Sequence, residues 1–266
     1  MASAAYTSSL RYCLRVQANV IGATMMRELH TRFGRENIGY LWFLVEPMLL
    51  AAGITLAHLI TRTPLPGGLD IAPFYITGYV TYMMFRSNIN RAPVTLEGNK
   101  TLLYHKQITI FDLLFARCLL EALATLATMF LMLAGATVLG LGHMPARPLV
   151  LIGAMGLMFW FTFGVSMVLC AASEWSIIVE RLTHPATYLA LPVSGMFFLM
   201  SWTPEQVRPL LMLVPFAGII ELVRVGEFES VDATYVNLPY ILAWCVGLTI
   251  AGLLAIKVAR RHMHFA

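Results

Sequence analysis

Charged side chains are scarce in this sequence, and long apolar stretches take their place. Only 12% of the 266 residues are Asp, Glu, Lys or Arg, whereas 59% are hydrophobic and the mean hydropathy is +0.74. A soluble domain of this length has roughly 25% charged residues. Because one soluble core cannot bury so many apolar side chains, lipid must solvate many of them. The composition therefore excludes an ordinary soluble protein and predicts a membrane protein.

Sequence motifs for nucleotide binding, hydrolysis and metal binding are also absent. No GxxxxGK[ST] phosphate loop, HExxH or GxSxG occurs, and the nearest string, at 98–101, lacks the adjacent Gly-Lys pair. His262 and His264 stand two apart near the end of the sequence, a spacing that is a weak signal for a metal. We therefore expect no catalytic residues, no metal and no cofactor bound by this chain.

Cysteine pairs are missing too. The four cysteines form no CxxC pair, so we expect free thiols: Cys13, Cys118, Cys170 and Cys245. The first 37 residues are polar and basic and contain no compact apolar run. We therefore expect no cleavable signal peptide, and the first membrane span would also target the protein.

Apolar runs of about 20 residues dominate the rest of the sequence and match the thickness of a bilayer core. The uninterrupted run 149–172 lacks the alternation of a barrel strand, so the spans are predicted to be helices. The sequence predicts an all-α membrane protein with a six-span domain over 38–257. The expected spans are 38–60, 71–86, 113–140, 149–172, 185–202 and 237–256.

Three further segments do not fit a full span. Apolar residues recur at helical spacing over 8–33, which predicts an amphipathic helix at the membrane interface within 1–37. The polar stretch 86–107 is predicted to be a cytoplasmic coupling segment. Within 203–236 the apolar part is only half a span long, so this segment is predicted to be a re-entrant or interfacial helix pair on the external side. Residues 258–266 are predicted to form a short cytoplasmic tail.

The distribution of basic residues sets the expected orientation. With six spans and both termini in the cytoplasm, 14 of the 18 Lys and Arg residues fall on the cytoplasmic side. Such a bias is typical of inner-membrane proteins. Six helices in one bundle are largely filled by their own side chains, so a wide pathway predicts a homodimer.

Two strings in the sequence resemble a known family. The string RELHTRFGR at 27–35 is followed by IGYLW at 38–42 and by Glu46-Pro47, and a later string reads VPF at 214–216 and IIELVR at 219–224. Together they resemble the permeases of type-2 ABC exporters, especially the capsular-polysaccharide export branch. The family pattern has Asn where this sequence has Val214. The resemblance covers nearly the whole chain.

The resemblance implies an export machine with several components. Two permease chains would pair with two separate ATP-binding cassette subunits, which bind ATP and magnesium. A periplasmic co-polymerase and an outer-membrane channel would complete the route. The substrate would be a lipid-linked acidic polysaccharide, and the location would be the bacterial inner membrane. No nucleic acid partner is implied.

Basic and aromatic residues around the first two spans are the candidate substrate-binding residues. Arg27, Arg32 and Arg35 precede the first span, where they either anchor the topology or bind the anionic lipid head. The aromatic candidates are Tyr40, Trp42, Tyr75, Tyr79 and Tyr82. They either form an interfacial belt or stack on sugar rings, and the last three share one helical face.

Polar residues of the 86–107 segment are the candidate contacts with an ATPase. They are Thr95, Glu97, Lys100, Tyr104, His105 and Lys106. An ordinary solvated loop is the alternative interpretation. The pair Arg117 and Glu121 is expected to be structural, because charges four residues apart on a helix neutralise each other.

Other functions remain open from the sequence. The same fold could export O-antigen, a teichoic acid or a drug. An intramembrane enzyme would need several polar side chains converging within the spans, and the fourth and sixth spans carry no charge. A secondary transporter would need a coupling carboxylate, for which Glu46 is the one plausible candidate.

Overall fold

The computed structural model describes residues 10–33, 39–61, 64–99 and 108–262. Every regular element in these ranges is helical, which confirms the predicted all-helical fold. The α-helices are α1 Leu10–Phe33, α2 Gly39–Thr61, α3 Ile71–Arg91, α5 Ile110–Val138, α6 Pro148–Ser173, α7 Ile177–Ala190, α8 Arg208–Met212, α9 Pro215–Glu227 and α10 Leu238–His262. The 3-10 turns are η1 Pro66–Gly68, η2 Pro93–Thr95, η3 Glu97–Asn99, η4 Met200–Trp202 and η5 Ala233–Tyr235.

Among the residues that the structure describes, three helices are long and apolar enough to cross a membrane. They are α5, α6 and the part of α10 over Leu238–Arg260, with mean hydropathies of 1.9, 1.9 and 2.2. Each coincides closely with a span expected from the sequence. In α2 the described side chains include a shorter apolar stretch, Met48–Thr61. The full count of six spans therefore stays a prediction.

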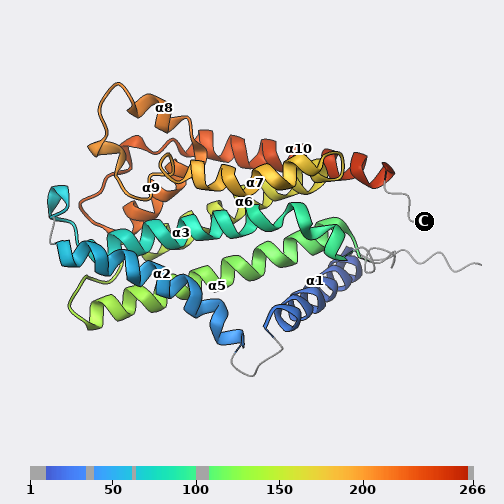
Figure 1. Ribbon diagram of the computed structural model, residues 1–266, viewed down its shortest axis with the longest axis horizontal. Coiled ribbons are helices and arrows are strands. Elements are labelled where there is room, and N and C mark those ends of the chain that lie inside the picture. Colours follow the sequence, from blue (N-terminus) through green and yellow to red (C-terminus); the bar gives the residue numbers. More distant parts are fainter. Residues whose placement is uncertain (1–9, 34–38, 62–63, 100–107, 263–266) are drawn as a thin grey trace, which may run out of the picture.

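The long helices lie side by side along the length of the molecule (Figure 1). The short helices α8 and α9 gather at one end, with η1 beside them, and we call this the α9 end. Helix α1 and the last turns of α10 lie toward the opposite end, which we call the α1 end. Helix α3 runs through the centre and is buried on most sides, from Ala72 to Ile89.

Helices α6 and α10 form the most extensive helix pair in the described structure. Glycines allow their close approach. A Cβ added to Gly252 would lie 2.6 Å from the Cβ of Met167, and one added to Gly164 would lie 2.8 Å from the Cβ of Leu248. Small residues at such crossings are the usual device for packing helices inside a membrane.

The predicted fifth span, 185–202, is not one continuous helix. Helix α7 starts earlier, at Ile177, where the Ser176 hydroxyl accepts a hydrogen bond from the Ile178 amide, and Pro185 lies inside the helix. The helix ends at Ala190 because Pro192 has no amide hydrogen to donate, and Gly195 adopts a φ of +75°. Turns then lead to η4. The sequence prediction was wrong about the position and the continuity of this helix.

The predicted second span also differs at its end. Helix α3 continues to Arg91, so the first part of the predicted coupling segment is helical. Pro93 follows the end of the helix and starts η2. The remaining described part of the coupling segment consists of η2 and η3, which run over the α1 end.

The α9 helix is fixed to the start of α6. The amides of Ala146 and Arg147 donate to the carbonyls of Glu227 and Gly226 at 3.0 and 2.7 Å. These bonds satisfy carbonyls at the carboxyl end of α9, which have no partner within the helix. A Cβ on Gly226 would lie 2.6 Å from the Leu151 amide nitrogen, so glycine is required at this contact.

Candidate functional site

An arginine holds the non-helical chain that follows α7. Arg224 of α9 is fully buried, and its guanidinium donates to the carbonyls of Gly195 at 2.7 Å and Met196 at 2.5 Å, and also to that of Phe198. The same group lies 3.8 Å from the ring centre of Phe74 in α3. These carbonyls belong to a stretch without regular hydrogen bonding, so Arg224 provides partners that a helix would otherwise supply.

Two further side chains extend this hold to η4. The Met200 amide donates to the carboxylate of Glu221, one turn before Arg224 on α9, at 3.2 Å. Arg208 of α8 donates to the carbonyls of Met200 at 3.0 Å and Thr203 at 2.8 Å. We call Arg208, Glu221 and Arg224 the α9-end clamp. It fixes the path of the chain from α7 to α8.

A cavity of about 330 Å³ lies beside the clamp at the α9 end. Glu221 forms part of its wall. The other lining residues are Gly67, Leu69, Leu199, Ser201, Trp202, Ser230, Val231, Asp232, Thr234 and Tyr235. The clamp therefore links the irregular chain after α7 to a polar cavity at this end of the molecule.

A second carboxyl group of α9 is buried at the same end. Glu227 is 5% exposed, and its Oε2 atom has no hydrogen-bond partner. Burial, reinforced by the nearby Asp70 carboxylate, raises the pKa of Glu227 to about 7. Asp70 is itself paired with the exposed His143 at 2.9 Å. The folded state thus favours the protonated form of Glu227.

Replacing Glu227 with glutamine should stabilise the protein at pH 8 and have little effect at pH 4. Because the pKa is raised from 4.5 to about 7 on folding, the proton stabilises the folded state below pH 4.5, and this contribution is lost as the pH rises through 7. We expect a rise of about 2–4 °C in melting temperature at pH 8. The exposed Glu229→Gln is the control. An equal gain at both pH values would contradict the buried carboxyl interpretation.

At the α1 end, side chains of α5 and α6 hold the turn η2. Arg117 of α5 donates to the Thr95 hydroxyl at 2.7 Å and to the Arg91 carbonyl at 3.4 Å. The Ser173 hydroxyl at the end of α6 donates to the Pro93 carbonyl at 3.0 Å. The described part of the coupling segment is therefore tied to the bundle rather than free in solvent.

Helix α1 joins the same network. Its Arg27 guanidinium donates to the side-chain oxygen of Asn99 in η3. Its Gln17 amide donates to the Asp112 carboxylate in the first turn of α5 at 3.1 Å. Thr24 and Glu28 on α1 are buried as well. Helix α1 thus packs against both the coupling segment and the start of α5.

The predicted aromatic candidates on α3 lie inside the bundle. Tyr75 stacks on His58 of α2 with ring centres 3.9 Å apart, and the Tyr82 hydroxyl donates to the Thr187 carbonyl of α7. Tyr79 belongs to the main hydrophobic core. All three are at most 6% exposed. The structure brings them together along one helix but against the chain's own helices.

The other predicted site residues are placed as follows. Thr95 is buried and bonded to Arg117, and Glu97 is exposed on η3. The side chains of several candidates lie outside the described residues: Arg32, Arg35, Tyr40, Trp42, Glu46, Lys100, Tyr104, His105 and Lys106. Of the four cysteines, Cys118, Cys170 and Cys245 are described, and each is a buried free thiol.

Two residues of these networks were not singled out from the sequence. Asn99 looked like part of a failed phosphate-loop match, and Gln17 was one polar residue on an amphipathic helix. The expected pairing of Arg117 with Glu121 stays a prediction, and the structure adds hydrogen bonds from Arg117 to Thr95 of η2 and to the Arg91 carbonyl at the end of α3. No local pattern signals a contact between segments 72 or 95 residues apart.

Comparison with known proteins gives matches over nearly the full length. The chain is 34% identical over 249 residues to the capsule polysaccharide export inner-membrane protein CtrC of Neisseria meningitidis serogroup A, covering 93% of this chain and 94% of that protein. It is 30% identical over 250 residues to BexB of Haemophilus influenzae, a protein of the same description, covering 94% of each. The polysialic acid transport protein KpsM of Escherichia coli is 25% identical, with 90% of this chain and 92% of that protein covered.

A scan against protein-family models gives no match. The family follows instead from the relatives, whose similarity covers more than nine tenths of the chain. The chain therefore belongs to the family of capsule polysaccharide export inner-membrane proteins.

Proposed function

We propose that this chain is the membrane permease subunit of an ATP-driven exporter that moves a lipid-linked, acidic capsular polysaccharide across the bacterial inner membrane. The observation that carries the proposal is the similarity to CtrC and BexB over more than nine tenths of the chain. The apolar helices α5, α6 and α10 support a membrane-embedded role. The chain acts as a homodimer and performs no catalysis itself.

The α1 end faces the cytoplasm in this proposal, and the α9 end faces the periplasm. The basic residues of α1 and of the last turns of α10 support this orientation, because cytoplasmic segments are enriched in Lys and Arg. Both termini are then cytoplasmic. A periplasmic co-polymerase that leads to an outer-membrane channel would meet the α9 end.

Two separate ATPase subunits bind ATP and magnesium and dock on the 86–107 segment. The described part of this segment supports that role. Its Glu97 is exposed, and its Thr95 is hydrogen-bonded to Arg117 of α5. A docked subunit could then push on α1, α5 and α6 through Asn99, Arg117 and Ser173. Transmission by rigid-body movement of helices is a common mode of such coupling.

Substrate contacts are proposed for the residues around the first span. Arg27, Arg32 and Arg35 would attract the phosphate of the lipid anchor, and Tyr40 and Trp42 would contact sugars. The α3 tyrosines are packed against α2 and α7. They can meet a glycan only after these helices separate from α3.

The proposal is tested by purifying the tagged chain from its native locus in mild detergent. We expect a soluble ATPase to co-purify in equal amount, and deletion of the permease gene to leave polysaccharide inside the cell with none on the surface. A chain that purifies without an ATPase, together with normal surface polysaccharide in the deletion strain, would refute the exporter role.

A further inference from the structure

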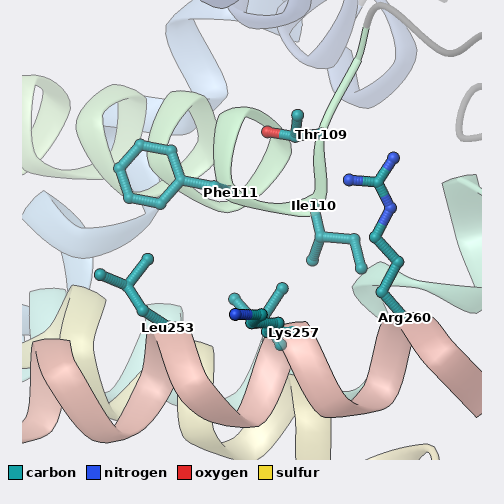
Figure 2. Close-up of a pocket in the computed structure, with 7 residues that line it drawn as sticks. Thr109, Ile110, Phe111, Leu253, Lys257 and Arg260 are labelled. Atoms are coloured by element: carbon teal, nitrogen blue, oxygen red, sulfur yellow. The ribbon is translucent and has the colours of Figure 1, made fainter.

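A cavity opens between the start of α5 and the last turns of α10. Its volume is about 450 Å³, larger than the cavity at the α9 end. It is lined by Thr109, Ile110, Phe111, Leu253, Ile256, Lys257 and Arg260. Figure 2 shows the α10 side chains extending toward α5 and the Arg260 side chain rising beside Ile110. A cavity of this size is large enough for part of an organic ligand.

The cavity has two cations at its mouth. Lys257 and Arg260 stand three residues apart, so both project from one side of α10. Among the residues that the structure describes, neither has a hydrogen-bond or ion-pair partner. Two unneutralised cations beside one cavity favour an anionic ligand, and Arg260 can bind a phosphate through two parallel hydrogen bonds.

Two amides at the start of α5 already have partners within that helix. The Thr109 hydroxyl accepts a hydrogen bond from the Asp112 amide, and the Asp112 carboxylate accepts one from the Thr109 amide, at 3.2 and 3.1 Å. This reciprocal arrangement satisfies the amides of Thr109 and Asp112. An anion at the cavity therefore pairs mainly with Lys257 and Arg260.

The remaining wall is apolar and leads onto the lipid-facing side of α10. Ile110, Phe111 and Ile256 form the interior, while Leu253 is 45% exposed and Leu254 beside it is 59% exposed. A free phosphate or a nucleotide would leave this apolar wall unused. A molecule with a charged phosphate and a hydrocarbon chain matches both parts.

We propose that this cavity binds an anionic membrane phospholipid, with its phosphate at Lys257 and Arg260 and its first acyl segment along Phe111, Leu253 and Ile256. The lipid would brace the start of α5, which directly follows the 86–107 segment. The inference needs only that the helices lie in a membrane. It holds whichever solute is exported.

Native mass spectrometry of the full-length detergent-purified chain tests the site. The probes are phosphatidylglycerol, phosphatidylcholine and inorganic phosphate, each added alone. We expect retained phosphatidylglycerol, little phosphatidylcholine and no inorganic phosphate. In Lys257→Ala/Arg260→Ala, phosphatidylglycerol affinity should fall roughly 30-fold, or about fivefold for each cation near a membrane surface. The matched control is Arg181→Ala, an exposed arginine on α7.

A second variant keeps both cations and fills the cavity. Leu253→Trp should also lose phosphatidylglycerol while keeping the wild-type melting temperature, which separates the site from general surface charge and from misfolding. Equal retention of phosphatidylcholine, unchanged binding in both variants, or binding of inorganic phosphate with the affinity of the lipid would each overturn the proposal.

Discussion

Replacing Arg224 with alanine should abolish export and remove most of the protein from the membrane. The guanidinium is fully buried and donates to three backbone carbonyls, which no other described side chain replaces. Its loss leaves those carbonyls and the Glu221 carboxylate without a buried positive partner. Removing one member of such a buried set typically destabilises by roughly 3–5 kcal/mol. The measurements are membrane levels by immunoblot and thermal unfolding in detergent.

The conservative and control variants make this prediction specific. Arg224→Lys keeps the charge but has a single nitrogen that cannot reach all three carbonyls while stacking on Phe74, so it should restore only part of the stability. Arg208→Ala removes a half-buried arginine from the same clamp and should have a smaller effect. If Arg224→Ala accumulates and melts like the wild type, the clamp has no structural importance.

Replacing Arg27 with alanine should separate ATP hydrolysis from export. Arg27 links α1 to Asn99 of the coupling segment, whereas Arg117 and Ser173 hold that segment independently of α1. In the proposed exporter the ATPase can therefore still dock and hydrolyse ATP, but its movement no longer reaches α1. A hydrogen bond from a charged group contributes about 1.5–3 kcal/mol, so we expect export to fall roughly tenfold or more.

Arg15→Ala is the matched control, because Arg15 is an exposed arginine on the same helix. Surface polysaccharide and ATPase activity of the purified complex are measured side by side for both variants. Export and hydrolysis should be normal in Arg15→Ala. A parallel loss of hydrolysis and export in Arg27→Ala would indicate that α1 is needed for docking, and it would contradict the uncoupling mechanism.

The helices that the sequence predicts well are those whose stabilisation is local. The apolar runs that became α5, α6 and α10 are long enough to satisfy their backbone groups within one segment, so hydropathy alone locates them. The helical spacing of apolar residues at 8–33 likewise predicts that α1 is a helix, whereas its amphipathic character and its place at the membrane interface stay a prediction. The resemblance carried by the strings at 27–47 and 214–224 led to the right family.

The predictions that differed depend on contacts between distant segments. An apolar run at 185–202 looks like a complete span, and its end at Ala190 requires partners for the carbonyls beyond it. Arg224, about 30 residues later, supplies them. The tyrosines of α3 share one face, as the spacing predicts, but the sequence cannot show that α2 and α7 cover that face.

The glycine contacts between α6 and α10 make this helix pair stiffer than the part of the protein around α7. The two backbones approach closely at Gly164 and Gly252, so sliding one helix along the other would cause a clash at Met167 or Leu248. We therefore expect α6 and α10 to move together as one rigid unit. The irregular chain after α7 also packs closely at one point, where a Cβ added to Gly78 would lie 2.6 Å from the Met196 carbonyl oxygen, but much of its path is held by side-chain hydrogen bonds that can exchange. The conformational change of transport should therefore bend the α7 side of the bundle while the α6–α10 pair stays fixed.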